Sequence, residues 1–260
     1  MRRATHRWVL LGLVAWVLAP ILVLALRAAA PAWRYPQLLP EVFAPVTLLE
    51  VLATDRVRSA AITSLWLALA AGAAGSVLGF LIARTVTRAS PRLQQVTWAV
   101  ALFLVVAPPL AVGVGLQVAL LALGLGGTAP GVLLAHLVPA TGYLTLFAAG
   151  ILGTLDPGVE DEARTLGASP RQVWFRVLLP QLRPRLAESI LLGALVSWGQ
   201  LAITLLVGGG MVRTLPVEVL SLVRSGNDQA GALAALVLSV PPLLGLGLLV
   251  RGTRRTGAVV

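Results

Sequence analysis

The 260-residue chain contains no cysteine and no lysine, and it has only two histidines. Without cysteine it forms no disulfide, no iron–sulfur cluster and no zinc site with Cys ligands. His6 and His136 alone are too few for a histidine-rich metal site. Acidic and basic residues together make up 12% of the chain, about half of their usual share in soluble domains. We therefore expect no metal site in this chain.

Apolar side chains are abundant instead. They account for 58% of the residues, and the mean hydropathy is +0.91. A soluble domain of this length needs more polar surface than this composition provides, and disordered or fibrous chains have different compositions. The composition therefore predicts a membrane protein surrounded by a lipid bilayer.

The charge balance is strongly basic, with 20 basic residues, 10 acidic residues and a net charge of +10. In a soluble protein this excess would suggest a nucleic-acid partner. Every basic residue here is an arginine, and the arginines stand between the apolar runs. The excess of positive charge in cytoplasmic loops of membrane proteins explains this pattern better. We therefore expect no nucleic-acid partner.

The membrane spans are counted as uncharged runs between the charges. About 20 helical residues cross a hydrocarbon core about 30 Å thick. Six spans are predicted, at about 8–26, 59–83, 95–123, 131–155, 189–208 and 229–250. The fold class is thus an all-α membrane protein, with residues 1–260 forming a single transmembrane domain. The adjacent prolines Pro108 and Pro109 predict a kink in the third span.

Six spans place both termini on the same side of the membrane. With both termini in the cytoplasm, fourteen arginines lie on the cytoplasmic side and six on the other side, as the positive-inside rule requires. The first apolar run could instead be a signal peptide, with Ala28–Ala30 as the cleavage site. It is longer than a usual signal-peptide core, so we favour an uncleaved first helix.

The cytoplasmic segment 156–188 is the most densely charged long segment of the chain. Asp156 and Pro157 predict the start of a short helix, and Gly167 predicts its end. A second helix is predicted from Ser169, which forms a capping-box pattern with Gln172, to a stop at Leu179–Pro180. On these residues alone, the segment could equally be a solvated amphipathic connector.

This segment resembles the EAA loop of ABC importer permeases of the type I class. Five residues match that motif in identity or character and in spacing: Ala163, Gly167, Val177, Leu179 and Pro180. Asp161 stands where the family has Glu, and Glu162 stands where it usually has Ala. Weaker similarity to spermidine/putrescine-type permeases covers residues 33–40, 63–65 and 214–217, together with Gly79 and Ala83. The same likeness implies a short helix in the segment up to Asn227.

The resemblance implies that the loop docks on a cytoplasmic ATPase. The coupling residues would be Glu160, Asp161, Glu162, Ala163, Gly167 and Pro180. The small residues Ala163 and Gly167 would let the partner approach closely, and the acids would pair with arginine. Because the motif's acid is altered, either the ATPase supplies a matching basic residue or Glu160 and Glu162 share the acid's role.

The resemblance also implies the partners and the location. They are an ABC ATPase dimer that binds ATP and Mg, a second permease subunit (a paralogue or an identical copy) and an external solute-binding protein. The location would be the bacterial cytoplasmic (inner) membrane. The chain itself has no phosphate-binding loop motif and no lysine. We therefore expect it to bind no cofactor and to have no catalytic residue.

The translocation path is less clearly marked in the sequence. No Asp or Glu lies inside a predicted span, which argues against a proton-coupled carrier and against a strong cation site within the spans. The candidate path residues are Tyr143, Ser197, Trp198, Gln200 and Thr204. Each could instead form helix–helix hydrogen bonds, and for His136 such a contact is the favoured interpretation. The likeness favours a polyamine as solute; a self-sufficient secondary carrier or channel is the alternative function.

Overall fold

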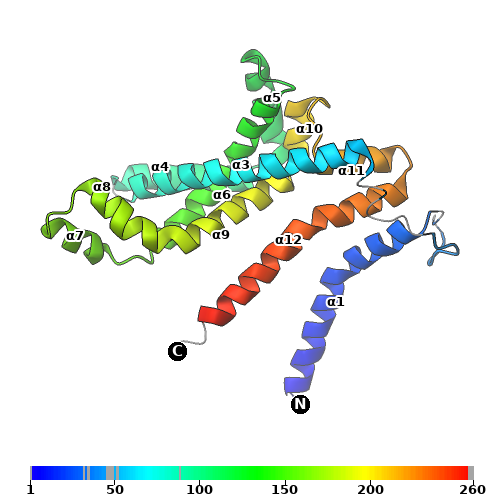
Figure 1. The fold of residues 1–260 in the computed structure, drawn as a ribbon, viewed down its shortest axis with the longest axis horizontal. Helices are drawn as coiled ribbons and strands as arrows, with labels where there is room; N and C mark the ends of the chain where they lie inside the picture. The colour runs from blue at the N-terminus through cyan, green and yellow to red at the C-terminus, as the bar shows by residue number, and fades with distance from the viewer. Residues whose placement is uncertain are drawn as a thin grey trace. The chain divides into compact units, whose positions relative to one another are not determined.

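The computed structural model describes residues 2–31, 33, 36–44, 50, 53–87 and 89–256. All regular structure in these ranges is helical, which confirms the predicted all-α class (Figure 1). The helices are α1 (Arg2–Ala29), α3 (Asp55–Val86), α4 (Pro91–Val106), α5 (Pro109–Ala122), α6 (Ala129–Leu152), α7 (Pro157–Thr165), α8 (Pro170–Gln172), the π-helix η1 (Val173–Leu178), α9 (Leu179–Trp198), α10 (Ala202–Gly208), α11 (Leu215–Arg224) and α12 (Asp228–Thr256).

Four of the described helices are long and apolar enough to cross a membrane. They contain the candidate spans Leu11–Ala29, Asp55–Val86, Ala129–Leu152 and Asp228–Gly245. Two further pairs meet the same test but are bent, by 103° between α4 and α5 and by 66° between α9 and α10. The count is therefore four, or up to six if each bent pair is one span. The kink predicted at Pro108 is confirmed, since α5 starts directly after it.

The break between α9 and α10 was not predicted. It lies at Gly199–Leu201, inside the expected span 189–208. Gly199 takes the C-cap position of α9, and Leu201 precedes the first residue of α10. A single glycine in an apolar run is a weak breaking signal, so the run looks continuous in the sequence. The segment expected to hold a short helix before Asn227 does form one, α11.

The chain divides into two compact units. The first contains residues 1–63 and 213–260, and the second contains residues 64–212. In the first unit α1 lies along α12, and α11 also contacts α12. The start of α1 and the end of α12 lie at the same end of this helix pair (Figure 1). Arg27 at the end of α1 forms an ion pair with Asp228 at the start of α12.

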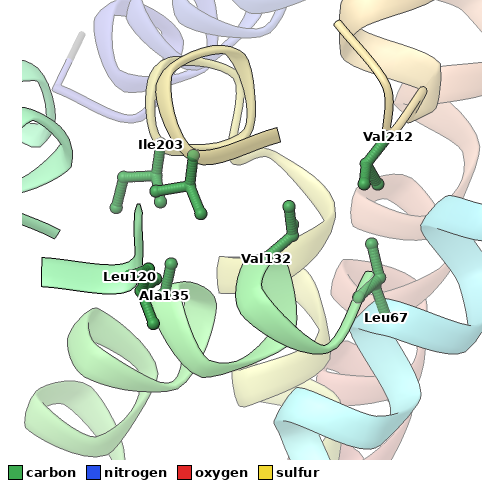
Figure 2. Close-up of a cluster of buried hydrophobic side chains, with 7 residues drawn as sticks. Leu67, Leu120, Val132, Ala135, Ile203 and Val212 are labelled. Carbon is green, nitrogen blue, oxygen red and sulfur yellow. The ribbon is translucent and has the colours of Figure 1, made fainter. Parts of the chain in front are cut away.

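In the second unit α6 is central, with contacts to α4, α5, α9 and α10. Its N-terminal half packs into a cluster of buried aliphatic residues from α3, α5, α6 and α10, completed by one residue that follows α10 (Figure 2). The members of this cluster are Leu67, Leu120, Val132, Ala135, Ile203, Val207 and Val212. A second cluster of buried residues joins the end of α6 to η1 and α9. Part of the predicted cytoplasmic segment 156–188, namely η1 and the start of α9, is therefore anchored in the core of the unit.

Small residues let the helices of the second unit approach closely. A Cβ atom added to Gly79 of α3 would lie 2.6 Å from the backbone carbon of Leu144 in α6. At the crossing of α3 and α9, a Cβ atom added to Gly193 would lie 2.9 Å from the Cα atom of Gly72. The hydroxyl of Ser189 donates a buried hydrogen bond of 2.9 Å to that of Ser76 at the same crossing. Such small-residue contacts are typical of helix association in membranes.

Candidate functional site

Helix α7 forms with the caps that the sequence predicts. The Asp156 side chain accepts a hydrogen bond of 2.8 Å from the Gly158 amide, and Pro157 takes the first helical position. At the other end Gly167 has a φ of 82°, a left-handed conformation that glycine adopts without strain. The Ala168 amide then donates to the Ala163 carbonyl over 3.0 Å. The result is a short helix that is fixed at both ends.

The next helix begins as predicted but does not stop where predicted. Ser169 and Gln172 form a reciprocal capping box, with hydrogen bonds of 3.4 Å and 2.8 Å. The predicted stop at Leu179–Pro180 is wrong, because α8 runs through the π-helix η1 directly into α9. Pro180 stands in the first turn of α9, at the change from π- to α-helical hydrogen bonding. Pro180 has no amide proton to donate, and it lies where the hydrogen-bond pattern itself changes, so the helix continues past it.

The three acidic residues of α7 lie in different surroundings. Glu160 is largely buried and forms two hydrogen bonds of 3.2 Å with the guanidinium of Arg84, at the end of α3. Arg164 lies 3.5 Å from the same carboxylate, and the Arg84 guanidinium stacks 5.0 Å from the ring centre of Trp174. Asp161 and Glu162 are exposed. Glu160 therefore binds α7 to its own unit, whereas Asp161 and Glu162 face outward.

The small residues of the predicted coupling motif also fall into two groups, one facing the permease and one facing outward. Ala163 packs against the second buried cluster of the unit, so it faces the protein's own interior. Gly167 is exposed, and a Cβ atom added there would meet no atom within 4 Å. Pro180 is exposed as well. Leu166, which the sequence analysis did not single out, has 88% of its surface exposed beside the outward acids.

We expect Glu160→Gln to loosen α7 from α3. The substitution leaves Arg84 without its charged partner, at a cost of about 1 kcal/mol once partial exposure is discounted. Hydrogen exchange of the α7 amides should then become about 5-fold faster at pH 7. Glu188→Gln is the matched control, because Glu188 pairs with Arg185 in an exposed i, i+3 ion pair. Equal α7 exchange rates in both variants would contradict this role of Glu160.

His136 is the centre of a buried polar group in the second unit. Its Nδ1 atom lies 2.8 Å from the hydroxyl of Ser197 in α9, and its Nε2 atom lies 2.9 Å from the hydroxyl of Thr204 in α10. The Thr204 hydroxyl in turn lies 2.6 Å from the Gln200 carbonyl oxygen, to which it donates. All three side chains are buried. His136 of α6 therefore bridges both sides of the α9–α10 break.

The hydrogen-bond directions follow from this chain of contacts. Because Thr204 donates its one hydroxyl proton to the Gln200 carbonyl, it must accept from His136 Nε2. A neutral imidazole with its proton on Nε2 accepts at Nδ1, so the Ser197 hydroxyl donates there. This arrangement confirms the expectation that His136 makes a helix contact. Two of the five predicted path residues, Ser197 and Thr204, are thus engaged in hydrogen bonds with His136.

The other predicted path residues differ in exposure. Trp198 is buried, Gln200 is partly buried, and Tyr143 has 36% of its surface exposed. Their role in a path stays a prediction. No group of three or more His, Cys, Asp or Glu residues suited to a metal ion occurs in the part of the chain that the structure describes.

The fold is that of the membrane subunits of ABC transporters. The chain superimposes on a bacterial ABC transporter for import of the acidic polysaccharide alginate with a TM-score of 0.69 and 15% identity, covering 97% of this chain and 96% of that one. It also superimposes on an amino acid ABC transporter with a TM-score of 0.58 and 19% identity, covering 82% of this chain and 100% of that one.

The chain belongs to the family described as "Binding-protein-dependent transport system inner membrane component", whose profile matches residues 75–255. It is 30% identical to the molybdenum transport permease ModB of Mycobacterium tuberculosis, over 93% of this chain and 92% of that relative. It is 36% identical to the putrescine transport permease PotI of Escherichia coli K12, over 43% of this chain and 40% of that relative. The chain thus matches less than half of PotI.

A third relative is the putative 2-aminoethylphosphonate permease PhnV of Salmonella typhimurium. It is 34% identical over 58% of this chain and 57% of that relative. The named solutes of these three relatives differ in charge and chemistry. The family therefore makes this chain an inner-membrane component of a binding-protein-dependent transport system, without fixing its solute.

Proposed function

We propose that this permease forms the path for a small solute in an importer driven by a separate ABC ATPase dimer, which binds ATP and Mg. A second permease subunit, identical or paralogous, completes the path, and an external solute-binding protein delivers the solute. Both termini lie in the cytoplasm. We place six spans at about the predicted boundaries, with each bent helix pair as one span, and we place loop 156–188 against the ATPase.

The observation that carries the coupling role is the two-sided character of α7. Its inner side is fixed to the permease by Glu160 and Ala163, so a displacement of α7 moves the end of α3 and the helices of the second unit. Its outer side presents Asp161, Glu162 and Leu166. An acidic rim beside an exposed apolar side chain suits a groove with arginines on an ATPase. A self-sufficient carrier would have no use for this surface.

The positions of the three acids in α7 also indicate which of them can contact the ATPase in place of the motif's glutamate. Glu160 is engaged within the permease, which leaves Asp161 and Glu162 as the acids for the ATPase. Gly167 and Pro180 lie in exposed surroundings, where an approaching ATPase would meet them. The coupling surface that we propose therefore consists of Asp161, Glu162, Gly167 and Pro180, with Glu160 and Ala163 as its anchors.

For the solute we propose a small amine, with polyamines as the first group to test. Two of the three relatives named above are associated with compounds that carry a primary amine, putrescine and 2-aminoethylphosphonate. The molybdenum permease supports an anion instead. Uptake of labelled putrescine and of labelled molybdate by whole cells, each measured with and without an excess of the other compound, separates these two solute classes.

The coupling role is tested with the double substitution Asp161→Asn and Glu162→Gln. We expect co-purification of the ATPase to fall at least 10-fold in mild detergent and ATP-driven uptake in proteoliposomes to be lost. Helix α7 should remain folded, because Glu160 and both caps are untouched. Glu188→Gln serves as the control for removal of a cytoplasmic charge. Normal uptake by the double variant would refute the docking surface, and isolation of the permease without any ATPase would refute the importer assembly.

A further inference from the structure

A pocket of about 330 Å³ lies in the first unit, at the ends where α3, α11 and α12 begin. Its volume is at the lower end of the range for small-molecule sites. Three apolar residues, Val57, Leu222 and Ala230, form part of its wall. The remaining lining residues are polar or charged. The pocket thus has room for a short aliphatic molecule with a polar head group.

The polar feature of this pocket is the carboxylate of Glu218 in the first turn of α11. Only 3% of this side chain is exposed. Its charged partner among the described residues is Arg56, whose Nε atom lies 3.6 Å from Oε1. That distance is longer than an N–H···O hydrogen bond. Buried carboxylates normally accept several hydrogen bonds, so Glu218 has unused acceptor capacity toward the pocket.

A second buried polar group lies at the same end of α11, outside the residues that line the pocket. Thr214 is buried and takes the N-cap position of α11, but its side chain makes no capping hydrogen bond. Within the described residues its hydroxyl oxygen has no hydrogen-bond partner. Thr214 and Glu218 are four residues apart, so their side chains lie on the same side of the first turn. The start of α11 therefore has one buried hydroxyl without a hydrogen-bond partner and one buried carboxylate whose ion pair is long.

Two further polar side chains of the pocket, Gln229 and Thr54, present hydrogen-bond acceptors. The Gln229 side-chain nitrogen already donates to the carbonyl oxygens of Ala28 and Ala44, over 2.9 Å and 2.7 Å. The atom that Gln229 can still offer a ligand is therefore its side-chain oxygen. Thr54 donates its hydroxyl proton to the Glu50 carbonyl over 3.4 Å, which leaves its oxygen as an acceptor. Together with the Glu218 carboxylate, these acceptors favour a ligand that donates hydrogen bonds.

The charged side chains of the pocket also favour a cationic ligand. Among the described residues that line the pocket, Glu50 and Glu218 are acidic and Arg56 is basic, which gives these residues a formal charge of minus one. The Arg56 side chain is 58% exposed, so it can move into solvent at little cost. A cationic ligand can then take its place beside Glu218.

From these contacts we infer that the Glu218 pocket binds a primary alkylammonium group, with its –NH₃⁺ on the Glu218 carboxylate in place of Arg56. Three N–H donors meet the acceptors Glu218, Gln229 and Thr54, and the alkyl chain lies on the apolar wall. A bare metal ion would leave most of the 330 Å³ empty. That the bound amine is also the transported solute rests on the proposed function. Binding of the amine to this pocket does not, because it needs no ATPase.

The test measures binding of 1,4-diaminobutane to the purified permease in lipid nanodiscs by calorimetry. Butane-1,4-diol serves as the neutral probe, and sodium and calcium chloride serve as the inorganic cations. We expect 1,4-diaminobutane to bind and butane-1,4-diol not to bind. Binding of the inorganic cations without the diamine would overturn the inference in favour of a metal site.

Three variants assign the binding to this pocket. Glu218→Gln should weaken binding of 1,4-diaminobutane at least 10-fold. Arg56→Gln should strengthen it about 3- to 10-fold, because the competing guanidinium is removed. A gain in affinity cannot result from unfolding, so this variant keeps the test valid if Glu218→Gln is unstable. Asp55→Asn is the control, since Asp55 is adjacent but exposed and paired with Arg58. Unchanged binding by both Glu218→Gln and Arg56→Gln would overturn the inference.

The outcome is independent of the test of the coupling surface. Diamine binding that depends on Glu218 without ATP-driven uptake would support the pocket and refute the proposed solute transport. ATP-driven uptake with diamine binding unaffected by Glu218→Gln and Arg56→Gln would support the importer and refute the pocket.

Discussion

Gly72→Leu is expected to prevent stable packing of α3 against α9. A Cβ atom at Gly72 would lie 2.4 Å from the Ile190 carbonyl oxygen and 2.8 Å from the Ala194 amide nitrogen. Both atoms belong to the backbone of α9, so no side-chain rotation relieves the clash. Separating the helices would also break the buried Ser76–Ser189 hydrogen bond. Overpacking of this kind costs about 3 kcal/mol or more.

The measurement is the fraction of permease that remains monodisperse on size exclusion after a heating series. Gly115→Leu is the matched control: Gly115 is also inside a helix of the second unit, but an added Cβ atom meets nothing within 4 Å. We expect Gly72→Leu to reduce the folded fraction severely at temperatures that Gly115→Leu tolerates, with Gly72→Ala in between. Equal stability of the two Leu variants would mean that α3 and α9 do not approach as closely as described.

Local features of the fold could be predicted because they depend on residues close in sequence. The kink at Pro108, the N-cap at Asp156 and the end of α7 at Gly167 all follow from the local chemistry of proline, capping side chains and glycine. The same holds for the capping box of Ser169. The break after Gly199 was not predicted, since the apolar run continues on both sides of it.

The functional contacts could not be predicted in the same way, because they join residues far apart in the chain. Arg84 is separated from Glu160 by 76 positions, and in the sequence it is only one of many arginines that are predicted to be cytoplasmic. Glu218 looks like an ordinary acid in the first turn of an amphipathic helix, where the helix dipole favours it. Its burial depends on how α11 packs, and no local pattern shows this. The division of α7 into an anchored and an outward side likewise required the packed structure.

The second large effect is expected at His136, where Leu removes both hydrogen bonds that bridge the α9–α10 break. The Ser197 hydroxyl loses its acceptor, and the Thr204 hydroxyl loses its donor. Hydrogen bonds between helices in membranes contribute about 0.6 kcal/mol on average and up to about 1.7 kcal/mol. Since both bonds are buried, we expect His136→Leu to destabilise the permease by about 2–3 kcal/mol. ATP-driven uptake should fall as well, because the two arms of the broken helix are no longer held together.

A double-mutant cycle separates this bridge from a simple loss of packing. If the bridge exists, Thr204→Val costs stability in the native protein but little in the His136→Leu background, because its partner is already absent. Ser197→Ala should behave in the same way. Ser239→Ala is the control, since its hydroxyl donates only to the Ala235 carbonyl of its own helix, and it should cost less than about 0.5 kcal/mol in either background. Additive effects of His136→Leu and Thr204→Val would show that His136 does not connect α6 to α10.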